Sequence, residues 1–147
     1  MNTKRLSPLF LFFILLFPTI NYADDAGVIS WTKQTLLNTL TIDYKNMKTE
    51  LDKSKANYTP AAWGAFKSFL GDKVATIQDN QLTLHPTAPS SGTIVDAGNV
   101  DNVTYWRINQ PIDIPELNMS VTFTVVVIKA SNPPYLIQSV NMTQVQY

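Results

Sequence analysis

The side chains that could carry out acid–base or nucleophilic chemistry are few in this sequence. His85 is the only histidine, and the chain contains no cysteine. A conventional zinc site or a thiolate nucleophile therefore lacks its ligands. His85 stands directly before Pro86 at the end of a short alternating stretch, so we expect it at a solvent-exposed strand end rather than in a general-base role. The sequence thus predicts no catalytic, metal-binding or cofactor-binding residue, and no cofactor.

One pair of neighbours leaves an alternative open. Asp43 and Tyr44 could act together as acid and base if a pocket buried them and raised the pKa of the carboxyl group. A small-molecule-binding or enzymatic domain would follow from that arrangement. An aspartate between two helices is more often a capping or turn residue, and this is the reading that we favour. The chain is therefore expected not to be an enzyme.

Aromatic residues form a second candidate set, consisting of Trp31, Trp63, Phe66, Tyr105 and Trp106. Aromatic side chains at helical or strand spacing more often belong to the core than to a ligand groove. We expect Trp63 and Phe66 to hold a helix against a sheet. Neighbouring residues on a strand point to opposite faces, so one of Tyr105 and Trp106 should face outward. The outer face of the sheet is accordingly the predicted interaction surface.

The N-terminal residues 1–23 are typical of a secretory signal peptide. Lys4 and Arg5 precede the apolar run 9–17, a proline follows, and Ala23 fits the last position before cleavage. Residues 24–147 would then form one domain in the bacterial periplasm or outside the cell. An uncleaved anchor in the inner membrane, formed by residues 6–22, is the alternative.

Composition limits the partners and the source of stability. Without Lys4 and Arg5, nine basic residues face eleven acidic ones, a net charge of −2. Nucleic acid is therefore not an expected partner, since its binding requires clustered basic charge. A cysteine-free exported domain must be stabilised by packing alone.

The elements expected to position these residues are helices first and strands second. Apolar spacing predicts a helix over 27–42 and a short one over 46–55. Thr59 as N-cap and Pro60 at the first helical position begin a third helix, which we expect to end at Leu70 with Gly71 as its C-cap.

Alternating residues predict strands over 82–85, 93–95, 103–114, 119–129 and 137–145. Pro111 is expected to mark an edge or a bulge within its strand. Short polar turns between consecutive strands require antiparallel pairing. The predicted fold class is α+β, with N-terminal helices packed on a curved antiparallel sheet.

Several strings in this sequence resemble one family. They are Trp31, Leu40 to Asn46, Tyr58 to Phe66, Tyr105 to Ile108 with Pro111, and Val125 to Ile128. Together they resemble the DotI/IcmL family, also called TraM-like, across essentially the whole predicted mature chain. The string from Tyr58 to Phe66 is the most specific, with Ala62 where the family usually has Gly.

This resemblance implies a type IVB secretion or conjugation protein with a periplasmic domain of the nuclear-transport-factor-like cone fold. It also implies a non-enzymatic, protein-interaction role, with partners in a bacterial secretion or envelope complex, self-association included, and no small-molecule ligand. The family's core component carries a true membrane helix before this domain, whereas a short leader precedes it here. We therefore expect a periplasmic or secreted relative, and an exported effector of the secretion system is the further alternative.

Overall fold

The computed structural model describes residues 22–147, so the predicted leader lies outside the described residues except for its last two positions. Three α-helices and four β-strands make up the domain. The helices are α1 (Tyr22–Leu40), α2 (Met47–Ser54) and α3 (Pro60–Asp79), and the strands are β1 (Thr93–Val100), β2 (Val103–Ile114), β3 (Met119–Lys129) and β4 (Tyr135–Gln146). Short 3-10 turns lie at η1 (Lys55–Asn57) and η2 (Pro115–Leu117).

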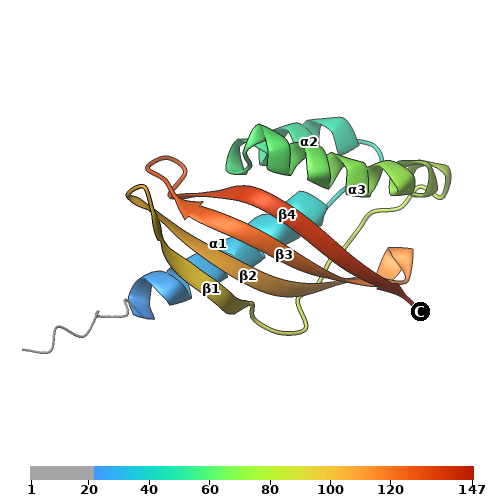
Figure 1. Ribbon diagram of the computed structural model, residues 1–147. Helices are drawn as coiled ribbons and strands as arrows, with labels where there is room; N and C mark the ends of the chain where they lie inside the picture. The colour runs from blue at the N-terminus through green and yellow to red at the C-terminus, as the bar shows by residue number, and fades with distance from the viewer. Residues whose placement is uncertain (1–21) are drawn as a thin grey trace, which may run out of the picture.

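The four strands form one antiparallel sheet in the order β1-β2-β3-β4. In Figure 1, α1 lies across one face of this sheet, while α2 and α3 lie on the side of β4. The helices therefore cover one face, and among residues 22–147 the opposite face carries no helix (Figure 1). The predicted α+β class, with helices packed on an antiparallel sheet, is confirmed.

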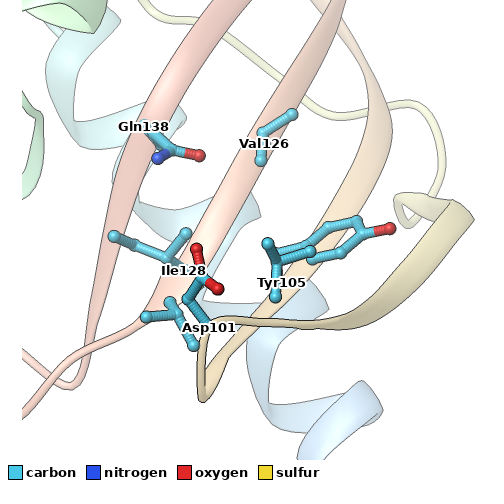
Figure 2. A pocket seen from close by; sticks show the side chains of 7 residues that line it. Asp101, Tyr105, Val126, Ile128 and Gln138 are labelled. Atoms are coloured by element: carbon cyan, nitrogen blue, oxygen red, sulfur yellow. The ribbon is translucent and has the colours of Figure 1, made fainter.

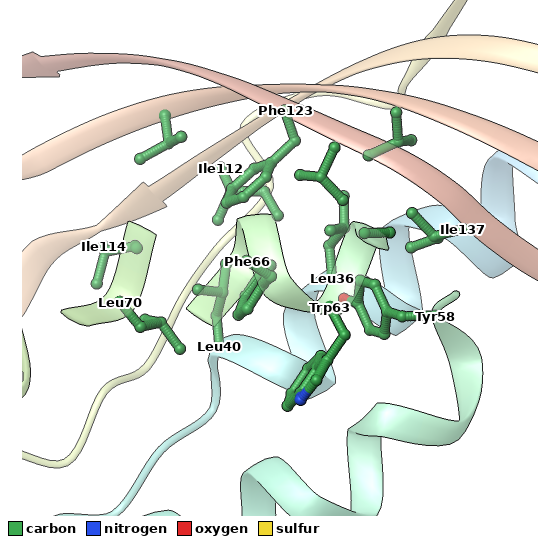
Figure 3. Close-up of a cluster of buried hydrophobic side chains, with 14 of the residues drawn as sticks. Leu36, Leu40, Tyr58, Trp63, Phe66, Leu70, Ile112, Ile114, Phe123 and Ile137 are labelled. Atoms are coloured by element: carbon green, nitrogen blue, oxygen red, sulfur yellow. The ribbon is translucent and has the colours of Figure 1, made fainter. Parts of the chain in front are cut away.

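The core lies between α1, α3 and the inner face of the sheet (Figure 3). Phe66 from α3 stacks on Phe123 from β3, with ring centroids 6.1 Å apart and an interplanar angle of 18°. Trp63 stacks on Phe66 and contacts Tyr58. The predicted role in joining helix to sheet is confirmed for Phe66, whereas the ring contacts of Trp63 are to Phe66 and Tyr58.

The third helix begins as predicted but ends nine residues later than expected, at Asp79. Thr59 is its N-cap and accepts a hydrogen bond from the Ala62 N–H at 3.4 Å, and Pro60 is the first helical residue. Gly71 lies inside the helix, so its predicted role as a C-cap is wrong. The helix continues because Ile77 is fully buried in the core, and this burial offsets the roughly 1 kcal/mol that a helical glycine costs.

Two strand predictions also need correction, and the first is the strand over 93–95, which continues to Val100 as β1. Residues 82–85 form no strand but an extended segment, in which Thr83 makes an isolated bridge to Asp43 and Leu84 is buried. Pro111 lies in β2, a central strand, opposite Thr122 of β3. The pairing of β1 with β2 ends at Asn109. The edge of β2 that faces β1 is therefore unpaired at Pro111, and the N–H that proline lacks is not needed for a sheet hydrogen bond.

The first helix starts before the predicted Gly27, because its first turn is attached to the sheet. The Trp106 indole N–H donates to the Asp25 carboxylate at 2.9 Å, and Lys129 lies 3.7 Å from the Asp24 carboxylate. The start of α1, the β1–β2 turn and the β3–β4 loop therefore lie at the same end of the sheet (Figure 1).

A buried hydroxyl pair joins α1 to the η1 turn and supports a first prediction. Thr39 donates its only hydroxyl hydrogen to the Thr35 carbonyl at 2.7 Å, so Tyr58 must be the donor in its 2.9 Å bond to Thr39. Burial raises the pKa of the Tyr58 hydroxyl, and the bond to Thr39 opposes this only in part. Tyr58→Phe should lower the free energy of unfolding by about 0.5–1.5 kcal/mol. Urea unfolding measures this, and an unchanged midpoint would contradict the bond.

Candidate functional site

The uncovered face of the sheet carries an open groove at the end where α1 begins (Figure 2). Its volume is about 470 Å³. Four strands and one turn supply the lining, which we call the outer groove: Val100, Asp101, Val103, Tyr105, Val126, Ile128 and Gln138. Because most of these side chains are aliphatic or aromatic, the outer groove is suited to apolar side chains of another molecule.

Strand alternation accounts for this position. On β2, Trp106 is 3% exposed and faces the core, so Tyr105 points to the other face. On β3, Val125 and Val127 are fully buried, while the intervening Val126 and the following Ile128 are partly exposed. The prediction that Tyr105 and Trp106 face opposite ways is confirmed.

Tyr105 is held in place by β1. Its ring lies over Gly98, where an added Cβ would come within 3.1 Å of the ring, and its hydroxyl donates to the Asp96 carboxylate at 3.2 Å. Gly98 is also the register partner of Tyr105, and Ile128 is its partner on the other side. The Tyr105 ring is thus held against β1, where it forms part of the outer groove surface.

The turn between β1 and β2 completes the outer groove. Asp101 and Asn102 both have positive φ, 50° and 65°, as a two-residue hairpin turn of the I′ kind requires. The flanking Val100 and Val103 are 59% and 42% exposed. Within the described residues, the Asp101 carboxylate has neither a hydrogen-bond nor an ion-pair partner. A single carboxylate therefore stands beside an apolar surface.

The sequence contains one signal for this groove that the strand pattern alone did not reveal. The outward-facing positions of β3 are Ser120, Thr122 and Thr124 in its first half but Val126 and Ile128 in its second. This change from hydroxyl-bearing to aliphatic residues marks where the outer face becomes apolar. The contributions of Val100 and Gln138 depend on strand register and were not predictable from their local sequence.

His85 is exposed, as predicted, but it is not isolated. Its ring Nδ1 lies 2.9 Å from the Glu116 carboxylate, and its backbone N–H donates to the same oxygen at 3.1 Å. Since a carboxylate only accepts hydrogen bonds, Nδ1 carries the hydrogen. The pair connects the extended segment before β1 to the η2 turn. The partner was not predictable, because thirty-one residues separate the two.

This pair predicts a pH-dependent contribution to stability. Partial burial would raise the pKa of the Glu116 carboxyl, but hydrogen bonds from its own backbone and from His85 outweigh this and hold that pKa below its usual value. A depressed carboxyl pKa stabilises the fold above the unfolded-state value of about 4.3, and this contribution is lost as the pH falls through the folded-state pKa.

Glu116→Gln should therefore reduce the free energy of unfolding at neutral pH, and the difference from the unaltered protein should shrink as the pH falls from about 6 to 3. Urea unfolding at a series of pH values measures this. A difference that is constant across the range would show that the ionised carboxylate contributes nothing.

Asp43 and Tyr44 are placed at a turn between α1 and α2. The Asp43 carboxylate accepts a hydrogen bond from the Lys45 N–H at 2.8 Å, the geometry of an aspartate that closes a turn on its own backbone. The Lys45 ammonium lies 5.5 Å from the centre of the Tyr44 ring. These contacts give Asp43 a turn role, and neither residue lines the outer groove.

The described part of the chain offers no cluster of three or more His, Asp or Glu side chains that could hold a metal ion. No helix within residues 22–147 is long and apolar enough to cross a membrane.

Fold and site together define an α+β domain whose helices cover one sheet face and whose other face presents an apolar groove. The sequence model of the type-IV b secretion system inner-membrane complex component, DotI/IcmL, matches residues 17–145. The chain belongs to this family. A search of curated proteins finds no sequence that matches it.

Solved structures share the fold. The periplasmic domain of DotI is similar over 81% of this chain and 94% of its own, with 20% identity and a TM-score of 0.68. A periplasmic fragment of TraM covers 84% and 98%, with 14% identity and a TM-score of 0.69. An IcmL-like type IV secretion system protein from Legionella pneumophila subsp. pneumophila covers 83% and 94%, with 16% identity and a TM-score of 0.63.

Proposed function

We propose that this protein is a non-enzymatic interaction domain of the bacterial envelope, periplasmic or secreted, that binds protein partners of a type IVB secretion complex through the outer groove. The uncovered apolar surface around Tyr105 and Ile128 carries this proposal. Membership of a family of secretion-complex components supports protein partners of that kind.

The exposed aliphatic side chains of the outer groove would gain free energy on binding another molecule. An aliphatic side chain left in water forgoes about 1.5–3 kcal/mol relative to full burial. The outer groove contains several such side chains. Elsewhere on the same face, the outward positions of β3 carry hydroxyl-bearing residues instead. A contiguous apolar patch on an otherwise polar face is typical of an interaction site.

The polar groups of the outer groove do not form a catalytic set. Its polar side chains are those of Asp101, Tyr105 and Gln138, and it contains no histidine, serine, lysine or cysteine. The Tyr105 hydroxyl is already engaged with Asp96, which is itself exposed. The Asp101 carboxylate is exposed, and no second acid–base side chain of the lining pairs with it, so this arrangement is suited to recognition and not to acid–base catalysis.

Site-specific photo-crosslinking in living cells tests the proposal. A photoreactive residue replacing Ile128, inside the outer groove, should form crosslinks to secretion-system proteins. The same residue replacing Thr122, on the same strand and face but outside the outer groove, is the matched control. Equal crosslinking from both positions, or none from position 128, would contradict binding through the outer groove.

The proposed location of the protein in the bacterial envelope is tested separately. We propose that the leader is removed after Ala23, which leaves Asp24 in the first turn of α1 as the new N-terminus. The Asp24 and Asp25 carboxylates would then offset the new α-ammonium group at the start of the helix, and Asp24 would keep its ion pair with Lys129. N-terminal sequencing of protein recovered from the periplasm should begin at Asp24. An intact Met1 in the membrane fraction would instead favour the anchored alternative through residues 6–22.

A further inference from the structure

We infer that the outer groove recognises a protein segment in which an apolar side chain is followed by a basic one. This inference rests on the proposed function and names the chemistry of its partner. The apolar side chain packs between Tyr105 and Ile128, and the basic side chain pairs with the Asp101 carboxylate. Both features lie within one groove lining (Figure 2).

The charged side chains around the outer groove determine how a bound segment is oriented. Asp101 stands at the hairpin turn with no partner within residues 22–147, and no lysine or arginine lines the outer groove. Asp96 already accepts the Tyr105 hydroxyl. Arg107 lies one outward row farther from the turn, as the register partner of Asp96 and Val126. A bound segment therefore places its basic residue toward the turn, where it meets a carboxylate and avoids the guanidinium.

The size of the apolar surface argues for a segment and against a second copy of the whole domain. Four strands spaced about 4.8 Å apart and about five residues of strand length give roughly 300 Å². A stable protein–protein interface buries about 800 Å² on each partner, of which about 450 Å² is apolar. The apolar part of this face is thus too small to hold two domains together, but it accommodates one or two side chains of an extended segment.

Synthetic peptides and methyl NMR of the purified exported protein test this inference. The probe is a blocked peptide with two leucines followed by two lysines, and its counterpart carries glutamates in place of the lysines. Because so few side chains are buried, we expect a dissociation constant of about 1 mM for the lysine peptide and one about tenfold higher for the glutamate peptide. Chemical shifts should move at the methyl groups of Val100, Val126 and Ile128.

Asp101→Asn should remove the preference for lysine, while Asp79→Asn, an exposed aspartate at the end of α3, should keep it. Equal binding of the two peptides, or shifts on another surface, would overturn the inference. Groove signals that broaden with protein concentration alone would show a second copy as the occupant and would also overturn it.

The two proposals fail separately. If neither peptide binds but Ile128 still crosslinks to secretion-system proteins, the inferred chemistry of the segment is wrong and the proposed function stands. If peptides do not bind and crosslinks are absent, both are wrong.

Discussion

Phe66→Ala is expected to lower the free energy of unfolding by about 3–5 kcal/mol, a large share of the stability of a domain of this size. Phe66 is fully buried and contacts aromatic rings from α3, β3 and the segment before α3. Its removal leaves a cavity where α3 stacks on Phe123 of the sheet, a contact that Phe69 supports only edge-on. Thermal or urea unfolding followed by circular dichroism measures the loss.

Tyr147→Ala is the matched control, because this aromatic ring is 71% exposed at the end of the chain. We expect it to change the free energy of unfolding by less than about 0.5 kcal/mol. If both variants lose the same stability, the aromatic cluster around Phe66 is not the centre of the core.

Trp106→Ala should also cost about 3–5 kcal/mol, because the residue is nearly fully buried and packs edge-on against Tyr135 at 5.7 Å. Its indole N–H is in addition the donor to Asp25 in the first turn of α1. The variant should therefore lose amide-exchange protection at the start of α1 before it loses protection in β3.

Trp106→Phe separates these two contributions, since it keeps most of the ring and removes the N–H. A loss of about 1–2 kcal/mol is expected, together with faster amide exchange in the second turn of α1, whose N–H groups donate to the carbonyl groups of the first turn. If exchange there is unchanged in both variants, the bond to Asp25 does not hold that end of the helix.

Much of the fold follows from local sequence. The strands over 103–114 and 119–129 have the predicted bounds, because uninterrupted alternation defines both the strand and its buried face. The start of α3 is equally well defined, since Thr59 and Pro60 act within one turn. Local signals of this kind need no knowledge of the rest of the chain.

The errors arose where distant contacts outweigh local preference. Gly71 is a helix-ending residue by its own tendency, but the burial of Ile77 against the sheet extends α3 past it. Leu82 to His85 alternates like a strand, yet in the fold only the Leu82 carbonyl and the Leu84 N–H bond to the segment after α1, too few for a strand ladder.

The candidate site was predictable only in part. That one of Tyr105 and Trp106 faces outward followed from alternation, and so did the choice of the outer face as the interaction surface. The groove itself depends on register, which sets Tyr105 beside Ile128 and brings the β1–β2 turn to their side. Its carboxylate, Asp101, had no distinguishing feature in the sequence.

The role of the outer groove is tested most directly by co-purification from envelope fractions with one charged residue placed inside or outside it. Ile128→Lys and Thr122→Lys lie on the same face of β3 and are both partly exposed, so each should fold. We expect Ile128→Lys to reduce recovery of secretion-system proteins about tenfold or more, and Thr122→Lys to leave it near the level of the unaltered protein. Undiminished recovery with Ile128→Lys would contradict binding through the outer groove.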